Sequence, residues 1–387
     1  MKNQLSAVRV GLSLGLISAL RIFGLMVIVP ILSLHASDYH TNYGGVGLAI
    51  GIYGLFQAIG QMPFGRLSDQ YGRKNVLTFG LLLFALGSFI AAIAQSIHWL
   101  ILARVLQGIA AVNGVVSAFA VDLVKEEKRP VVLGIIGGMI GVTFFIAICI
   151  APALDRLIGL PGIFTLTGML SLVAIIWLWS VIPDPTQHLK APDWKWSIYK
   201  QPEFVWCAGS AGIIHGVFTA TFSLLPTYVL SCGYVPSDMS YVYGISMLIA
   251  AALIVVMMRL LMKDKSHQRE SVIWLLLAMS FGLALLMSPN CLILGLGLFI
   301  GMFGLLEAIL PSVLSQSIES NRRGAYMGGF YAVAQFGVFI LSAFAGTMRT
   351  HASFSMVLAM LAFIIGIWAT SKFVYDMRLK LNESYNV

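Results

Sequence analysis

The chain has 387 residues, of which 59% are hydrophobic and only 10% are charged. Soluble domains carry roughly 25% charged residues, so this composition excludes a water-soluble globular fold and indicates a protein whose solvent is the lipid bilayer. The formal net charge of +8 raises the question of a nucleic-acid partner, which the positions of the basic residues must answer. The four cysteines show no CxxC spacing, so we expect neither a metal site nor a disulfide framework.

Twelve apolar segments are long enough to span a membrane as helices, which takes about 20 mostly apolar residues each. The expected spans are 9–34, 45–64, 75–95, 98–124, 131–154, 162–182, 204–230, 239–262, 271–288, 291–316, 324–348 and 352–373. The first is too long for the apolar core of a signal peptide and lacks a cleavage signal. The sequence therefore predicts an all-α membrane protein with twelve transmembrane helices.

Lysine and arginine are distributed unevenly between the alternate loops. Of the 24 basic residues, two (Arg156 and Arg349) lie in one set of loops and two (Arg21 and Arg104) lie inside spans, which leaves 20 for the other loops and the chain ends. Basic loops stay in the cytoplasm, so we expect both termini to be cytoplasmic in a bacterial inner membrane. This asymmetry explains the basic charge, and we expect no nucleic-acid partner.

The longest polar stretch, residues 183–203, contains four prolines and divides the chain into two similar halves. We expect an N-terminal six-helix bundle over 1–182, a cytoplasmic central loop over 183–203 and a C-terminal six-helix bundle over 204–387. A faint repeat supports this division: Glu126, Lys128 and Arg129 follow span 4, and Glu319, Arg322 and Arg323 follow span 10. Parallel repeats of six-helix halves build one large class of transporters.

Four charged or titratable side chains lie deep inside predicted spans, where burial is costly and function is the usual reason for it: Arg21, Arg104, His215 and Glu307. Glu307 can alternate between protonated and ionised forms, as proton coupling requires, or it can be a structural acid hydrogen-bonded to another helix. Histidine titrates at about pH 6.5, so His215 can exchange protons or make a polar contact between helices. Arg21 can bind an anionic substrate, a titrating acid or a structural partner.

Uncharged polar side chains at membrane depth are expected to line an internal cavity, because unsatisfied amides are costly in lipid. The candidates are Tyr53, Gln57, Gln61, Asn113, Tyr331 and Gln335. The first three recur at i, i+4 and i+8 and the last two at i and i+4, so each set shares one face of its helix.

The loop between spans 2 and 3 reads Gly65-Arg66-Leu67-Ser68-Asp69-Gln70-Tyr71-Gly72-Arg73-Lys74. Gly65 and Gly72 allow close helix approach and a tight turn. Asp69 can face the N-terminus of another helix, where a carboxylate is favoured, and Arg73 can pair with Asp122. A solvated basic loop that only sets topology is the alternative, but topology needs neither the aspartate nor the spaced glycines.

This loop resembles the signature loop of the major facilitator superfamily, G-x-L-(A/S)-D-x-x-G-R-(K/R), in sequence and in position. Arg104 to Gly108 is similar to the family's R-x-x-Q-G pattern in span 4, which has an acidic position at its end where Asp122 stands here. Gly138 to Pro152 resembles the antiporter motif of drug:proton antiporters, which usually ends Gly-Pro but here ends Ala-Pro. The chain is most similar to the YajR-type branch of these twelve-helix antiporters. The residues that carry this likeness are Arg21, Pro30, His215 and Glu307 to Pro311.

The resemblance implies a latch on the cytoplasmic side, formed by Gly65, Asp69, Gly72, Arg73 and Asp122. In it, Asp69 faces the start of span 11 near Gly324, and the latch favours the outward-open state. The resemblance also assigns Arg104 to proton coupling.

No phosphate-binding GxxxxGK[ST] motif and no catalytic or metal constellation occurs at membrane depth, so we expect neither an enzyme nor a cofactor, and a proton gradient as the energy source. The two halves and the latch disfavour a channel. The favoured function is a monomeric, proton-coupled antiporter that exports small amphipathic compounds by rocking of its halves. The alternatives are a proton-coupled importer of a siderophore or another metabolite, and a non-transporting sensor of the same fold.

Overall fold

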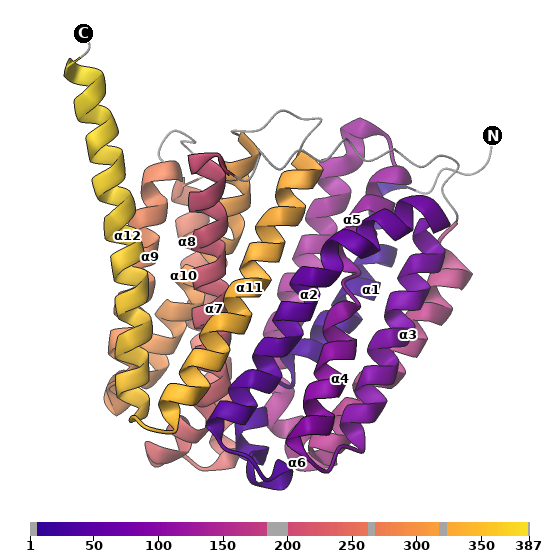
Figure 1. Cartoon of the computed structure of the whole chain (residues 1–387), viewed down its shortest axis with the longest axis horizontal. Coiled ribbons are helices and arrows are strands. Elements are labelled where there is room, and N and C mark those ends of the chain that lie inside the picture. Colours follow the sequence, from indigo (N-terminus) through magenta and orange to yellow (C-terminus); the bar gives the residue numbers. More distant parts are fainter. Residues whose placement is uncertain (1–5, 184–199, 262–267, 317–322, 386–387) are drawn as a thin grey trace.

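The computed structural model describes residues 6–183, 200–261, 268–316 and 323–385, and it consists of helices joined by short turns over those residues (Figure 1). The α-helices are α1 (Ala7–Met26), α2 (Tyr43–Tyr71), α3 (Arg73–Ala92), α4 (Ile97–Ile109), α5 (Asn113–Asp122), α6 (Arg129–Val181), α7 (Pro202–Ser231), α8 (Met239–Leu261), α9 (Gln268–Leu286), α10 (Leu292–Gln316), α11 (Arg323–Arg349) and α12 (Phe354–Tyr385). Most of the central segment 183–203, and Glu319 and Arg322 of the expected repeat, lie outside the described residues.

The helix count agrees with the twelve predicted spans once the short helix α9 is included and the long helix α6 is counted as two spans. Ten apolar helical segments in the described residues are long enough to cross a membrane, and Glu270–Leu286 is a shorter apolar helix. The 53-residue α6 is far too long for one crossing, because a bilayer core of about 30 Å takes about 20 helical residues. It breaks at Gly159, whose φ of 65° and ψ of 170° are not helical, so it supplies the predicted spans 131–154 and 162–182.

Two predicted spans differ from the structure in their continuity. The first, 9–34, is α-helical only as far as Met26, and a turn and the short 3-10 helix η1 (Leu32–His35) follow. Pro30 lies in this turn, and a proline disfavours helical backbone at the residue before it. The fourth, 98–124, is interrupted between Ile109 and Asn113, so that α4 and α5 form one crossing with a break.

Most helices pack within their own half of the chain. In the N-terminal half, α6 packs on α1 and α3, and α4 packs on α2 and α3. In the C-terminal half, α10 packs on α7, α8 and α9, α7 on α11, and α9 on α12, around one large apolar cluster. Contacts between the halves run mainly between α2 and α11, with further contacts of α6 with α8 and of α2 and η1 with α7.

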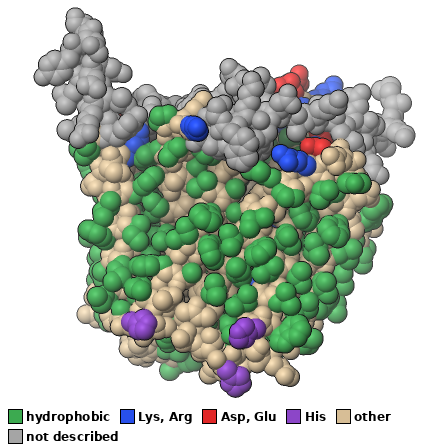
Figure 2. All heavy atoms as spheres, in the orientation of Figure 1, with side chains coloured by type: hydrophobic (Ala, Val, Ile, Leu, Met, Phe, Trp, Pro, Cys, Tyr) green, Lys and Arg blue, Asp and Glu red, His purple; other side chains and the backbone are tan. Residues whose placement is uncertain are grey.

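The surface has a broad apolar band between two polar faces (Figure 2). The face where α1 begins and α12 ends, which we call the terminal face, shows described lysines and arginines, whereas histidines gather at the opposite face. An apolar band of this kind is what a bilayer requires of the protein surface it contacts.

Candidate functional site

Two arginines of the N-terminal half lie around one tyrosine at membrane depth. Arg21 of α1 donates from Nη1 to Asn113 Oδ1 at 2.6 Å and from Nη2 to the Tyr53 hydroxyl at 2.8 Å. The guanidinium carbon of Arg104 lies 4.8 Å from the centroid of the same tyrosine ring. Both arginines are buried, and no ion pair among the described residues joins either to a carboxylate. We call Arg21, Tyr53, Arg104 and Asn113 the arginine cluster.

Close packing and a helix break build the arginine cluster. A side chain on Gly108 would overlap the backbone carbonyl of Tyr53, so glycine lets α4 approach α2 closely. The helix then stops at Ile109, Ala110 turns with ψ of 57°, and α5 starts afresh at Asn113. Broken helices at membrane depth occur where backbone is buried in protein or lines a water-filled cavity. The break places the Asn113 side chain on Arg21.

A titratable pair lies at membrane depth in the C-terminal half. His215 Nε2 of α7 lies 2.6 Å from Glu307 Oε2 of α10, and the glutamate side chain is 38% exposed. The histidine ring meets Phe303 edge to face, with centroids 5.2 Å apart, and Phe303 stacks on Phe218. The structure thus brings together two residues that the sequence singled out separately, and it leaves the glutamate side chain partly exposed.

The predicted polar stripe divides between the protein interior and accessible space. Tyr53 and Gln57 are almost fully buried, and Gln57 Oε1 has no hydrogen-bond partner among the described residues. Gln61 and Gln335 are half-buried, and Tyr331 is exposed. Tyr53 therefore belongs to the arginine cluster, and the accessible candidates for cavity lining are Gln61, Asn113, Tyr331 and Gln335.

Arg73 is the centre of a polar network at the terminal face. Gly72, with φ of 90°, makes the single-residue turn that joins α2 to α3. Arg73 then donates from Nε to Asp122 Oδ2 at 2.8 Å, and its guanidinium also pairs with Asp69. The Arg73–Asp122 pair is the one expected from the sequence. Asp69 is paired within its own loop, and no described contact joins it to α11, whose first side chains lie outside the described residues.

The two halves touch near the opposite face through α2 and α11. A methyl group added at Gly51 would lie 2.9 Å from the Phe339 carbonyl oxygen, and one at Gly54 would lie 2.7 Å from the Gln335 carbonyl oxygen. Closer to the face, the Arg349 guanidinium lies 4.9 Å from the Tyr43 ring centroid. Backbone meets backbone here because glycine removes the side chains between the helices. We call this contact the α2–α11 gate.

Toward the terminal face the same elements separate, and Figure 1 shows α2 and α11 diverging in that direction. A methyl group added at Gly65 of α2, at Gly134 or Gly138 of α6, or at Gly328 of α11 would meet nothing within 4 Å. Over the described residues, α2 and α11 are therefore in contact at the opposite face and apart toward the terminal face.

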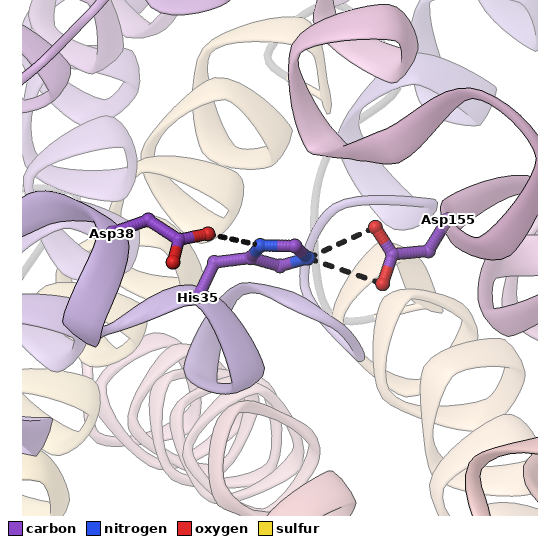
Figure 3. A network of polar contacts seen from close by, with 3 residues as sticks. All are labelled: His35, Asp38 and Asp155. Carbon is purple, nitrogen blue, oxygen red and sulfur yellow. Dashed lines mark hydrogen bonds and ion pairs between the residues drawn. The ribbon is translucent and has the colours of Figure 1, made fainter.

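A histidine held by two carboxylates lies at the opposite face (Figure 3). His35 Nδ1 lies 2.7 Å from Asp38 Oδ2, and Nε2 lies 2.9 Å from Asp155 Oδ1. These bonds, that to Asp155 foremost, outweigh partial burial and raise the pKa of His35 above its usual 6.5. Next to Asp155, Arg156 donates to the Pro236 carbonyl oxygen of the other half at 3.0 Å. The sequence analysis missed this group, since nothing in the spacing of 35, 38 and 155 joins them.

Because the pKa of His35 is raised in the folded protein, its stabilising contribution is complete below pH 6.5 and is lost as the pH rises through the raised value. We expect His35→Gln to lower the melting temperature in detergent at low pH, which corresponds to a loss of about 1 kcal/mol of stability after solvent screening. At high pH the melting temperature of the variant should approach that of the wild type. The exposed His98, changed to Gln, is the matched control on the same face. A deficit that is constant or grows with pH would contradict this assignment.

Comparison with known proteins adds three findings. A family model described as Major Facilitator Superfamily matches residues 14–269. The chain is 30% identical over 369 residues to the inner membrane transport protein YajR of Escherichia coli (strain K12), which covers 92% of this chain and 81% of that protein. It is also 32% identical over 151 residues to the tetracycline resistance protein, class H, of Pasteurella multocida, covering 37% of this chain and 36% of that protein.

The fold is similar to that of a solved bacterial homologue of the human lysosomal transporter Spinster, in its inward-facing and occupied conformation. The TM-score is 0.78 at 14% sequence identity, and the match covers 95% of this chain and 96% of the other. At this identity the likeness establishes the shared arrangement of helices.

Proposed function

The chain belongs to the major facilitator superfamily of membrane transporters, and we propose that it exports small amphipathic compounds in exchange for protons. It is a multi-pass transporter of small molecules and not an enzyme. The observation that carries the proposal is the His215–Glu307 pair, 2.6 Å apart, with an accessible carboxyl group at membrane depth. Such a pair can take up and release a proton while the surrounding helices move. The match to a tetracycline resistance protein supports export.

Transport requires that the substrate site opens to one side of the membrane at a time. We propose that residues 1–182 and 204–387 are two six-helix bundles joined by the segment 183–203, and that they rock about the centre of the membrane. The α2–α11 gate stabilises the conformation that the structure adopts, in which the protein is closed at the opposite face. The latch residues Gly65, Asp69, Gly72, Arg73 and Asp122 favour the other state, in which Asp69 faces the start of α11 near Gly324.

The direction of export depends on which face is cytoplasmic. We propose that the terminal face is cytoplasmic, because most of the described basic residues gather there, whereas Arg156 and Arg349 are the only described ones at the opposite face. The structure would then be open to the cytoplasm, ready to take up cargo. Gln61, Tyr331 and Gln335 would line the cavity, and a monomer in the bilayer would suffice, driven by the proton gradient without a cofactor.

Arg104 and Arg21, which the sequence analysis grouped with the proton-coupling residues, have no described carboxylate neighbour in this state. We propose that they act on proton coupling through the electrostatic field at the cavity rather than through a direct ion pair. Arg104 also donates from Nη1 to Gln107 Oε1 at 2.8 Å, within the R-x-x-Q-G pattern, so its side chain is held in place.

Proton movement in proteoliposomes tests the proposed function. The purified chain is reconstituted with a pH-sensitive dye inside, and a panel of amphipathic compounds is added one at a time. We expect some compounds to drive protons in the direction opposite to their own movement. Empty liposomes correct for compounds that carry protons through lipid by themselves.

Other outcomes of this experiment identify the two alternatives. Movement of protons together with the compound identifies an importer, and binding without any proton movement identifies a sensor. Either result overturns the proposal of export by exchange.

A further inference from the structure

The arginine cluster leaves an excess of positive charge at membrane depth. Among the described side chains that lie deep in the spans, Arg21 and Arg104 are cations and Glu307 is the one carboxylate. Glu307 is paired with His215 in the other half of the protein, so it does not serve as counter-ion to either arginine. Charged residues inside membrane spans are rare, and they mark substrate or ion pathways unless they pair with other groups of the protein.

The guanidinium of Arg21 has hydrogen-bonding capacity that its neighbours do not use. Its two bonds go to neutral oxygens, those of Asn113 and Tyr53, and its Nε is buried without a described partner. Arg104 Nη2 is likewise buried without a described partner. Neutral acceptors satisfy individual N–H groups, but they do not balance the charge. A planar guanidinium matches a carboxylate through two parallel hydrogen bonds.

Asn113 forms the accessible end of the cluster. Arg21 is only 3% exposed, whereas Asn113 is half-buried and the next residue, Gly114, is exposed. A methyl group added at Gly114 would meet only Gln61 Oε1, at 3.3 Å. The amide oxygen of Asn113, 2.6 Å from Arg21, therefore holds the position that an incoming carboxylate oxygen would take.

We propose that Arg21 binds the charged end of the substrate, so that the transported compounds are amphipathic organic anions and not organic cations. The carboxylate displaces Asn113 Oδ1 and takes two hydrogen bonds from the guanidinium. This inference rests on the proposed transport of amphipathic compounds and names their charge. The rival is a structural role, in which Arg21 only ties α1 to α2 and α5.

Equilibrium binding to the purified full chain in detergent, at neutral pH and without a gradient, tests the proposal. The probes are naphthoate, naphthamide and naphthylmethylammonium, which share a ring and differ in charge, and the same three derivatives of biphenyl. We expect only the carboxylates to bind by titration calorimetry. Losing a charge-assisted hydrogen bond in Arg21→Gln should weaken this binding about 10- to 100-fold. Arg9→Gln, on the same helix but exposed, is the matched control and should bind as wild type does.

A second variant separates binding from folding. Asn113→Asp gives Arg21 a carboxylate of its own, so it should prevent naphthoate binding while keeping or raising the melting temperature. A preference for the ammonium probes, binding of no carboxylate, or unchanged naphthoate affinity in Arg21→Gln overturns the proposal.

A failure of this inference can be distinguished from a failure of the proposed function. Naphthoate binding without proton movement would leave the anion site standing and overturn proton exchange. Proton-coupled export of naphthylmethylammonium would support proton exchange and overturn the anion site.

Discussion

Glu307→Gln is expected to abolish proton-driven accumulation of substrate in proteoliposomes while leaving exchange of labelled for unlabelled substrate largely intact. Glutamine keeps the size and polarity of the side chain but cannot release a proton, so the halves can still rock with substrate bound. Uphill transport should therefore fall to the background of empty liposomes. The measurement is the ratio of gradient-driven uptake to counterflow exchange in the same preparation.

His215 should behave differently, because its ring lies 2.6 Å from the Glu307 carboxyl group and can exchange a proton with it. We expect His215→Gln to change the pH dependence of transport and to retain part of the proton coupling. Glu126→Gln is the control, because it removes an exposed carboxylate outside the membrane core. This variant should transport as the wild type does. Normal proton-driven accumulation in Glu307→Gln would show that this pair is structural.

Gly51→Val is expected to open the α2–α11 gate. Its first side-chain carbon would lie 2.9 Å from the Phe339 carbonyl oxygen and 3.2 Å from the Phe339 Cα, and backbone atoms of a helix cannot turn aside as a side chain can. Overpacking of this kind costs about 1–3 kcal/mol, so the equilibrium should shift about 5- to 150-fold away from the state closed at the opposite face. Gly51→Ala should have a smaller effect in the same direction.

Distances between spin labels at Gln95 and His351, in a background without the four native cysteines, report the separation of the halves at the opposite face. We expect the long-distance population to grow in Gly51→Val. Gly244→Val is the control, because a methyl group added at Gly244 meets nothing within 4 Å. Asp69→Asn, which weakens the latch, should shift the population in the opposite direction and slow transport. An unchanged distance distribution in Gly51→Val would contradict the role of the gate.

Several features of the site were predictable from sequence motifs and from hydropathy. Arg73 and Asp122 were expected to pair, and their side chains lie 2.8 Å apart across 49 residues, since a loop of this pattern places them at the ends of neighbouring helices. Gly72 was expected to make a tight turn and has the positive φ that such a turn requires. His215 and Glu307 were each identified by their depth in an apolar span.

Other features depend on contacts between distant segments, and sequence spacing does not encode these. The helical phase of α7 against α10 determines that His215 meets Glu307. The sequence left three kinds of partner open for Arg21. The helix break at Ala110 places the Asn113 side chain against it. His35, Asp38 and Asp155 were not identified at all, because Asp155 of α6 lies 120 residues from His35 and meets it only in the folded chain.

The sequence by itself determined that this protein lies in a membrane, how many times it crosses, and to which superfamily it belongs. Hydropathy depends on each residue's own transfer from water to lipid, so it can be read one segment at a time. The tertiary structure alone decided at which face the halves are in contact, because the α2–α11 gate exists only where two helices from different halves meet. It also decided the partners of the buried charges, since a charge in a bilayer is stabilised by its neighbours in space and not by its neighbours in the chain.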